Sequence, residues 1–228
     1  MAEFKIIKGK PQAPSKFIVM GDPMTGKTTL AAKAPKPLFI STDGNAAKAG
    51  LDAVNADSLG VVREAVQHFA ENSDYDTLVI DTIEGVDDLF EKSIIQAWNA
   101  ETGQAVTSLN DVPYGKLTGQ FNRRIAAFSE TLWSLPKNVI VLTYTKRRID
   151  DVSGSIVLDS ELKTIRQFTR FADGIILVSY DGEHYRANVV SKRTVMAGEV
   201  KYGSIEPFLK AAGWELPTKK TKIGSTKK

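Results

Sequence analysis

The sequence predicts an α/β fold, with a mainly parallel sheet flanked by helices and a β-hairpin at one edge. Short, continuously apolar runs alternate with segments whose apolar residues recur every three or four positions. This pattern is typical of buried parallel strands joined by helices. A glycine-rich segment separates the first predicted strand from the first predicted helix. Near the end, two apolar runs flank Asp181-Gly182, which is a hairpin signal.

Six apolar runs are expected to form strands, because they are short and rich in β-branched residues. They are Ser15–Met20, Leu38–Ile40, Thr77–Ile80, Val139–Leu142, Ile175–Val178 and Tyr185–Val190. The segments between them have apolar residues at helical spacing. We expect helices over Thr28–Lys33, from Leu59 to Phe69, from Val86 to Trp98, from Phe121 to Leu135, and a short one from Leu162 to Phe168. Pro35 and Pro136 end the first and the fourth of these.

The chain of 228 residues is long enough for one domain with a full core. We expect this domain to span residues 15–216, after a polar lead-in at 1–14 and before a basic, disordered tail at 217–228. Hydrophobic residues make up 42% and charged residues 25%, which excludes a fibrous or wholly disordered protein. The tail, with five lysines and no acid, is either a solubilising end or an arm that touches a polyanion.

The absence of cysteine excludes disulfides, cysteine-ligated zinc, iron–sulfur clusters and thiol nucleophiles. No apolar run approaches the roughly 18 residues of a membrane helix, and the first ten residues lack the pattern of a signal peptide. We therefore expect a soluble, cytoplasmic protein with no membrane partner.

The glycine-rich segment Gly21-Asp22-Pro23-Met24-Thr25-Gly26-Lys27-Thr28 matches G-x-x-x-x-G-K-[ST] at every fixed position. Such a loop turns its backbone N–H groups toward phosphate oxygens. Lys27 can reach the β- and γ-phosphates, and the Thr28 hydroxyl can bind Mg²⁺. A chain of this length gives on the order of 0.01 accidental matches. We expect Gly21 through Thr28, together with Thr29, to bind a nucleotide.

Asp81 follows the buried strand Thr77–Ile80 and is the expected second contributor to the magnesium site. The alternative is a strand-ending Asp that caps the next turn. Thr82, not a glutamate, comes next, so the base that orients the attacking water must lie elsewhere. Asp43 is the first candidate and Glu84 the second. Asp43 is otherwise a turn residue in Asp43-Gly44-Asn45.

An acid after the second strand, with Asp followed by Thr after the third, resembles the RecA-type ATPase core. Together with the phosphate loop, the pattern is most similar to phage-encoded, RecA-like nucleotide-binding proteins, the Sak-type group of single-strand annealing proteins and recombinases. The resemblance covers residues 15–213. It implies a RecA-like P-loop NTPase core, ATP and Mg²⁺ as cofactors, single-stranded DNA as a partner, and a role in phage recombination in the host cytoplasm.

The same resemblance assigns further residues. Asp43 stands where the RecA type has a catalytic glutamate, and its shorter side chain implies slow hydrolysis. Tyr144 replaces a glutamine that senses the γ-phosphate. Arg193, or else Lys192, resembles the cation delivered to a neighbouring subunit's phosphates; a solvent-facing strand end is the alternative. A cation that acts on the nucleotide of a neighbouring subunit requires a ring or filament, so a second copy of the chain is an expected partner. A single-strand-binding protein is another expected partner.

In the RecA type, the segment after the sensing strand binds DNA. Here it is residues 145–162, whose start Lys146-Arg147-Arg148 suits a phosphate backbone and whose Ser153-Gly154-Ser155 suits a mobile loop. The segment has no aromatic residue to stack on bases. Acids nearly balance its charge: Asp150, Asp151, Asp159, Glu161 and, just past it, Asp173. Residues 110–124 are either a second DNA contact or the front of an ordinary helix, with Tyr114, Lys116, Phe121, Arg123 and Arg124.

The two histidines and three tryptophans do not form a site pattern. His68 and His184 have no second ligand at a suggestive spacing, so we expect structural roles. Trp98, Trp133 and Trp214 fall at helical positions and are expected in the core or an interface.

Three functions fit the sequence. The first is an ATP- and Mg²⁺-dependent ATPase that binds single-stranded DNA. The second is an ATP-binding annealing module with little hydrolysis. The third is a P-loop kinase or NTPase unrelated to DNA, for which the sequence has no arginine-rich lid or acceptor pocket.

Overall fold

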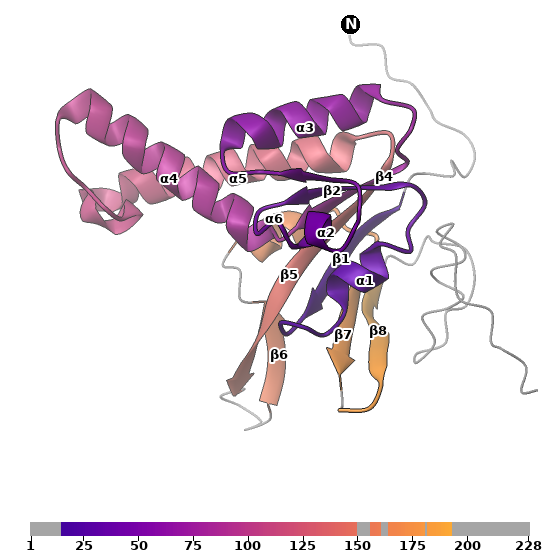
Figure 1. Ribbon diagram of the computed structural model, residues 1–228. Helices are drawn as coiled ribbons and strands as arrows, with labels where there is room; N and C mark the ends of the chain where they lie inside the picture. Colours follow the sequence, from indigo (N-terminus) through magenta and orange to yellow (C-terminus); the bar gives the residue numbers. More distant parts are fainter. Residues whose placement is uncertain (1–14, 150–155, 161–163, 181, 193–228) are drawn as a thin grey trace, which may run out of the picture.

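The computed structural model describes residues 15–149, 156–160, 164–180 and 182–192 (Figure 1). Seven strands form a sheet in the order β3-β2-β4-β5-β1-β7-β8, and β6 pairs with β5. All pairs are parallel except β5–β6 and β7–β8. The strands are β1 Lys16–Gly21, β2 Pro37–Ser41, β3 Ala53–Asn55, β4 Thr77–Asp81, β5 Asn138–Ile149, β6 Ile156–Ser160, β7 Gly174–Tyr180 and β8 Tyr185–Lys192. The predicted fold class is confirmed, including the antiparallel hairpin at one edge.

Helices connect the parallel strands. They are α1 Lys27–Ala31, α2 Asn45–Lys48, α3 Leu59–Glu71, α4 Ile83–Thr102, α5 Lys116–Ser134 and α6 Ile165–Thr169, with 3-10 turns at Leu109–Asp111 and Pro113–Gly115. Figure 1 shows α4 and α5 reaching together beyond the sheet. Each predicted helix has a counterpart, because its apolar residues recur at the spacing of a buried helical stripe. For the helix predicted from Leu162 to Phe168, the counterpart is α6, and residues 162 and 163 lie outside the described residues.

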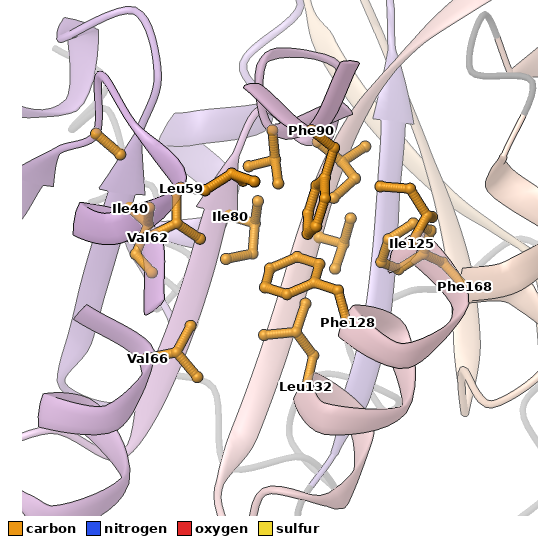
Figure 2. Packing of buried hydrophobic residues seen from close by; sticks show 14 of the residues in the cluster. Ile40, Leu59, Val62, Val66, Ile80, Phe90, Ile125, Phe128, Leu132 and Phe168 are labelled. Carbon is orange, nitrogen blue, oxygen red and sulfur yellow. The ribbon is translucent and has the colours of Figure 1, made fainter. Parts of the chain in front are cut away.

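Alternate residues of the central strands point to opposite faces of the sheet. Ile18 and Ile80 belong to a large cluster with the apolar stripes of α3, α4, α5 and α6. Its centre is drawn in Figure 2, where Phe90 of α4 packs on Phe128 of α5 with ring centroids 5.5 Å apart. Phe17 belongs to a smaller cluster covered by α1 and α2. Both faces of the strands are therefore buried, which explains their continuous apolar sequence.

The structure adds elements that the sequence did not predict. Strand β3 has three residues, and the turn expected at Asp43-Gly44-Asn45 leads into the four-residue helix α2. Such short elements contain too few residues for a hydrophobic period. The predicted strand Val139–Leu142 continues to Ile149 and pairs with β6. Much of the expected DNA-binding segment 145–162 therefore forms two antiparallel strands. The part predicted as a mobile loop, Ser153-Gly154-Ser155, lies outside the described residues.

Both neighbours of β1 extend past its end. Gly21, the last residue of β1, pairs with Tyr144, and β5 then runs on to Ile149. On the other side Met20 pairs with Leu177, and β7 runs on to Tyr180. The segment after β1 therefore starts between the β5–β6 and β7–β8 hairpins (Figure 1).

A carboxylate is buried where α4 meets α6. The Thr164 hydroxyl donates to Asp87 Oδ2 at 2.6 Å, whereas Oδ1 is buried with no hydrogen-bond partner in the described part of the chain. Burial raises the pKa of Asp87 to about 7; the Thr164 hydrogen bond opposes this shift, and Glu84, Asp88 and Glu91 add to it. Folding therefore favours the protonated carboxyl.

Asp87→Asn should change how the free energy of unfolding depends on pH. Between about pH 4 and pH 7, the folded wild type keeps a proton that the unfolded chain has released, so its stability falls as pH rises. Asparagine has no charge to bury. The free energy of unfolding of the variant should therefore rise relative to that of the wild type across this window, by at most about 4 kcal/mol above pH 7. Urea titrations from pH 4 to pH 8 measure the difference. The exposed neighbour provides the control Asp88→Asn, and parallel curves for wild type and Asp87→Asn would contradict the assignment.

Candidate functional site

The segment between β1 and α1 forms a tight loop. Gly26 has φ 86° and Met24 has φ 63°, both in the left-handed region. The Thr25 hydroxyl donates to the Asp22 carbonyl at 2.7 Å. Helix α1 begins at Lys27, directly after Gly26. Left-handed residues followed directly by a helix start fit a phosphate-binding loop, whose successive backbone N–H groups line a concave surface.

Both glycines of the loop lie against the β7–β8 hairpin. A Cβ on Gly21 would come within 2.5 Å of the Val178 carbonyl oxygen in β7. A Cβ on Gly26 would meet a Tyr185 ring carbon of β8 at 3.2 Å. Distances under about 3 Å are not tolerated against backbone, so Gly21 is fixed by packing and Gly26 by its left-handed φ. The hairpin therefore sets the place of the loop.

Lys27 lies under the loop with its ammonium turned inward. Its Nζ donates to the carbonyl oxygens of Gly21 and Asp22, each at 2.9 Å. The Tyr144 ring lies 4.3 Å from the same nitrogen, in cation–π geometry. Burial lowers the pKa of Lys27, and Asp81, Glu84 and Asp22 oppose that shift. The ammonium is therefore held by weak neutral acceptors, which phosphate oxygens can replace.

Thr28 and Asp81, the two residues predicted for a magnesium site, are in contact. The Thr28 hydroxyl donates to Asp81 Oδ2 at 2.8 Å, which leaves the hydroxyl lone pairs available to a cation. Burial raises the pKa of Asp81; the Thr28 hydrogen bond lowers it, Asp43 raises it and Lys27 lowers it. Among the described residues no group of three His, Cys, Asp or Glu side chains could hold a metal. One carboxylate and one hydroxyl fit Mg²⁺, which takes its other ligands from water and phosphates.

Asp43 lies near this pair and is tied to the start of α2. Its Oδ1 accepts from Ser41 Oγ at 3.0 Å and from Asn45 N at 2.9 Å, and its Oδ2 accepts from Asn45 Nδ2 at 2.6 Å. Ser41, two residues before it, pairs with Asp81 in the sheet, and the charge of Asp43 contributes to the raised pKa of Asp81. The turn role and the base role therefore fall on one side chain, and the base role stays a prediction.

Glu84 connects α4 to the end of β5. Its Oε1 accepts from Thr143 Oγ1 at 2.5 Å and from the Tyr144 backbone N–H at 2.8 Å. Its Oε2 is buried and has no hydrogen-bond partner among the described residues. Glu84 thus bonds the residue whose ring lies over Lys27, and its charge also acts on the pKa values of Lys27 and Asp81. The only sequence signal was its position three residues after Asp81.

Strand β5 contacts the loop through the residues just before its basic segment. Tyr144 lies over Lys27, and the Thr145 hydroxyl donates to the Asp22 carboxylate. The Thr145 contact was not predicted from the sequence. Lys146, Arg147 and Arg148 follow directly in β5, where they pair with Asp159, Leu158 and Val157 of β6.

Other predicted residues lie away from the loop or outside the described residues. Lys192 ends β8, and Arg193 and Trp214 lie outside the described residues. Trp98 and Trp133 pack against the large core cluster as expected. In residues 110–124, Phe121 is buried and Tyr114 is fully exposed.

The family follows from a direct match. A family model described as an AAA domain matches residues 13–200. The chain belongs to this family. The AAA domain match spans β1, the loop, Asp81 and both hairpins. No curated protein matches the chain.

Two solved structures are similar to this AAA domain protein. The RadB recombinase has 14% sequence identity and a TM-score of 0.47, with 80% of this chain and 83% of that chain covered. A KaiC-like protein of the archaeon Pyrococcus horikoshii has 14% identity and a TM-score of 0.44, with 80% and 81% covered. In the described part of the chain, no helix has both the length and the apolar character needed to cross a membrane.

Proposed function

We propose that this AAA domain protein binds ATP with Mg²⁺, hydrolyses it slowly, and binds single-stranded DNA. The observation that carries the proposal is the hydrogen bond from Thr28 to Asp81, beside the inward-turned ammonium of Lys27. The phosphate loop follows β1, Thr28 lies in α1, and Asp81 ends β4. All three lie at the carboxyl ends of parallel strands, where ligands of such sheets bind.

The residues divide the work of holding the nucleotide. The backbone N–H groups of the loop bind phosphate oxygens, and Lys27 moves from the two carbonyls to the β- and γ-phosphates. Thr28 would hold the cation through a hydroxyl lone pair, and Asp81, which accepts the Thr28 hydrogen bond, would hold it through water. Bound Mg²⁺ would stabilise the negative charge that develops on the phosphates.

For hydrolysis, Asp43 is proposed to orient the attacking water. Its carboxylate already accepts three hydrogen bonds, which limits its movement. This observation favours slow turnover, and it also favours the second candidate function, an annealing module that binds ATP with little hydrolysis. Tyr144 is proposed to report the γ-phosphate, because its ring covers the ammonium that must move.

DNA binding is proposed for the β5–β6 hairpin. The first strand of this hairpin contains Lys146, Arg147 and Arg148. Their positive charges suit a phosphate backbone. The Thr145–Asp22 hydrogen bond supports a route from nucleotide to DNA, since it joins the phosphate loop to this strand.

Assembly completes the proposal. Arg193, or Lys192, would reach the phosphates of a neighbouring copy, which requires a ring or filament. We propose the role in phage recombination in the host cytoplasm, with a single-strand-binding protein as a further partner, from the sequence resemblance alone.

The first test is ATP hydrolysis by the full chain, measured with and without single-stranded DNA. We expect a slow rate that DNA raises, because the loop and the basic strand are joined through Thr145 and Asp22. Lys27→Ala should abolish the rate in both conditions, since it removes the charge that holds the β- and γ-phosphates. A rate indifferent to DNA would refute the DNA role, and an undiminished rate in Lys27→Ala would refute the site.

The second test separates the two acids. Asp43→Asn should lower the single-turnover rate by roughly 10²-fold or more with little change in ATP affinity, and Asp43→Glu should raise it. Glu84→Gln is the matched comparison, because it removes a nearby carboxylate that bonds Thr143 and Tyr144 instead. The assignment is wrong if Glu84→Gln abolishes hydrolysis while Asp43→Asn leaves it unchanged.

A further inference from the structure

An aromatic surface borders the phosphate loop on the side of the β7–β8 hairpin. Tyr180 and Tyr185 are paired across the hairpin, with ring centroids 4.6 Å apart and an angle of 32° between the ring planes. We refer to this pair as the tyrosine face. The Tyr185 ring also lies directly over Gly26, 3.2 Å from where a Cβ would be. The tyrosine face therefore begins at the loop itself.

The tyrosine face is exposed although its rings are large and apolar. Tyr180 is 48% exposed and Tyr185 is 66% exposed. Among the described residues, the other large hydrophobic side chains exposed to solvent are Met24 and Tyr114, and Met24 belongs to the loop. Three of these four side chains thus cluster at the loop. Exposed apolar patches on soluble proteins commonly mark binding sites.

The position of the rings indicates which part of a ligand they would meet. Lys27 lies under Tyr144 on the β5 side, and its ammonium marks the end of the loop where the terminal phosphates bind. The tyrosine face lies on the other side of β1, along β7 and β8. A nucleotide held by the loop must place its base beyond the α-phosphate, within reach of the edge of the loop. Among the exposed rings of the described residues, only those of the tyrosine face border the loop on the side away from Lys27.

We propose that the tyrosine face stacks on the base of the nucleotide whose phosphates the loop binds, with Tyr185 as the main contact. This inference rests on the proposed nucleotide binding and assigns the base subsite. Aromatic rings stack on any nucleobase through their π-faces. Stacked DNA bases are the competing occupant. The nucleotide is favoured because Tyr185 touches the loop, whereas Lys146, Arg147 and Arg148 lie on the opposite side of β1.

The test compares two probes that differ by the nucleoside alone. Calorimetric titration of the full chain with Mg-ATP and with Mg-tripolyphosphate measures binding with and without a base. In Tyr185→Ala the dissociation constant for ATP should rise by about tenfold, since base stacking on an aromatic side chain is worth roughly 1–3 kcal/mol. The constant for tripolyphosphate should stay unchanged. Tyr185→Phe keeps the ring and should bind ATP as the wild type does.

A control variant and the contradicting results complete the test. Tyr114→Ala, which removes an exposed ring of the 3-10 turn before α5, should change neither constant. Unchanged ATP binding by Tyr185→Ala overturns the proposal, and so does an equal loss of ATP and tripolyphosphate, which would mean that Tyr185 only supports the loop. Loss of single-stranded DNA binding with ATP binding intact would assign the rings to DNA instead. A wild type that binds neither probe refutes the proposed function itself.

Discussion

The close packing of β1 between two longer strands is the constraint on which the site depends. Gly21 pairs with Tyr144 on one side, and on the other it has no room for a side chain against the Val178 carbonyl. The loop that follows therefore starts between the two hairpins and leads directly into α1. This placement directs Lys27 inward, toward Asp81 and Glu84, and it brings Asp22 to Thr145.

Burial gives the site its electrostatic character. It disfavours the ammonium form of Lys27 and the carboxylate form of Asp81, so their pKa values move in opposite directions, and the attraction between the two charges opposes both shifts. Groups held in this way gain from a ligand that brings its own charges. A triphosphate satisfies Lys27, and a divalent cation satisfies Asp81. The same pocket therefore favours both parts of a magnesium nucleotide together.

The parts predicted from sequence were those with a strong local signal. The phosphate loop has fixed residues at fixed spacing, and the buried strands and long helices have clear apolar periods. The contacts of Glu84, the Thr145–Asp22 hydrogen bond and the place of Tyr185 over Gly26 depend on which strands are neighbours, which no local pattern specifies. The β5 extension was missed because its residues Thr145 to Arg148 are polar, although they pair with β6. For Asp43 the sequence suggested two roles, a catalytic base and a turn residue. Its hydrogen bonds with Asn45 show the turn role directly.

The most direct measurement is a crystal structure of the full chain with Mg²⁺ and a non-hydrolysable ATP analogue. The account predicts that Lys27 Nζ leaves the carbonyl oxygens of Gly21 and Asp22 for the β- and γ-phosphates. It also predicts that Thr28 Oγ1 coordinates the metal while keeping its hydrogen bond to Asp81. A nucleotide bound elsewhere, or one that leaves Lys27 on the two carbonyls, would contradict the account.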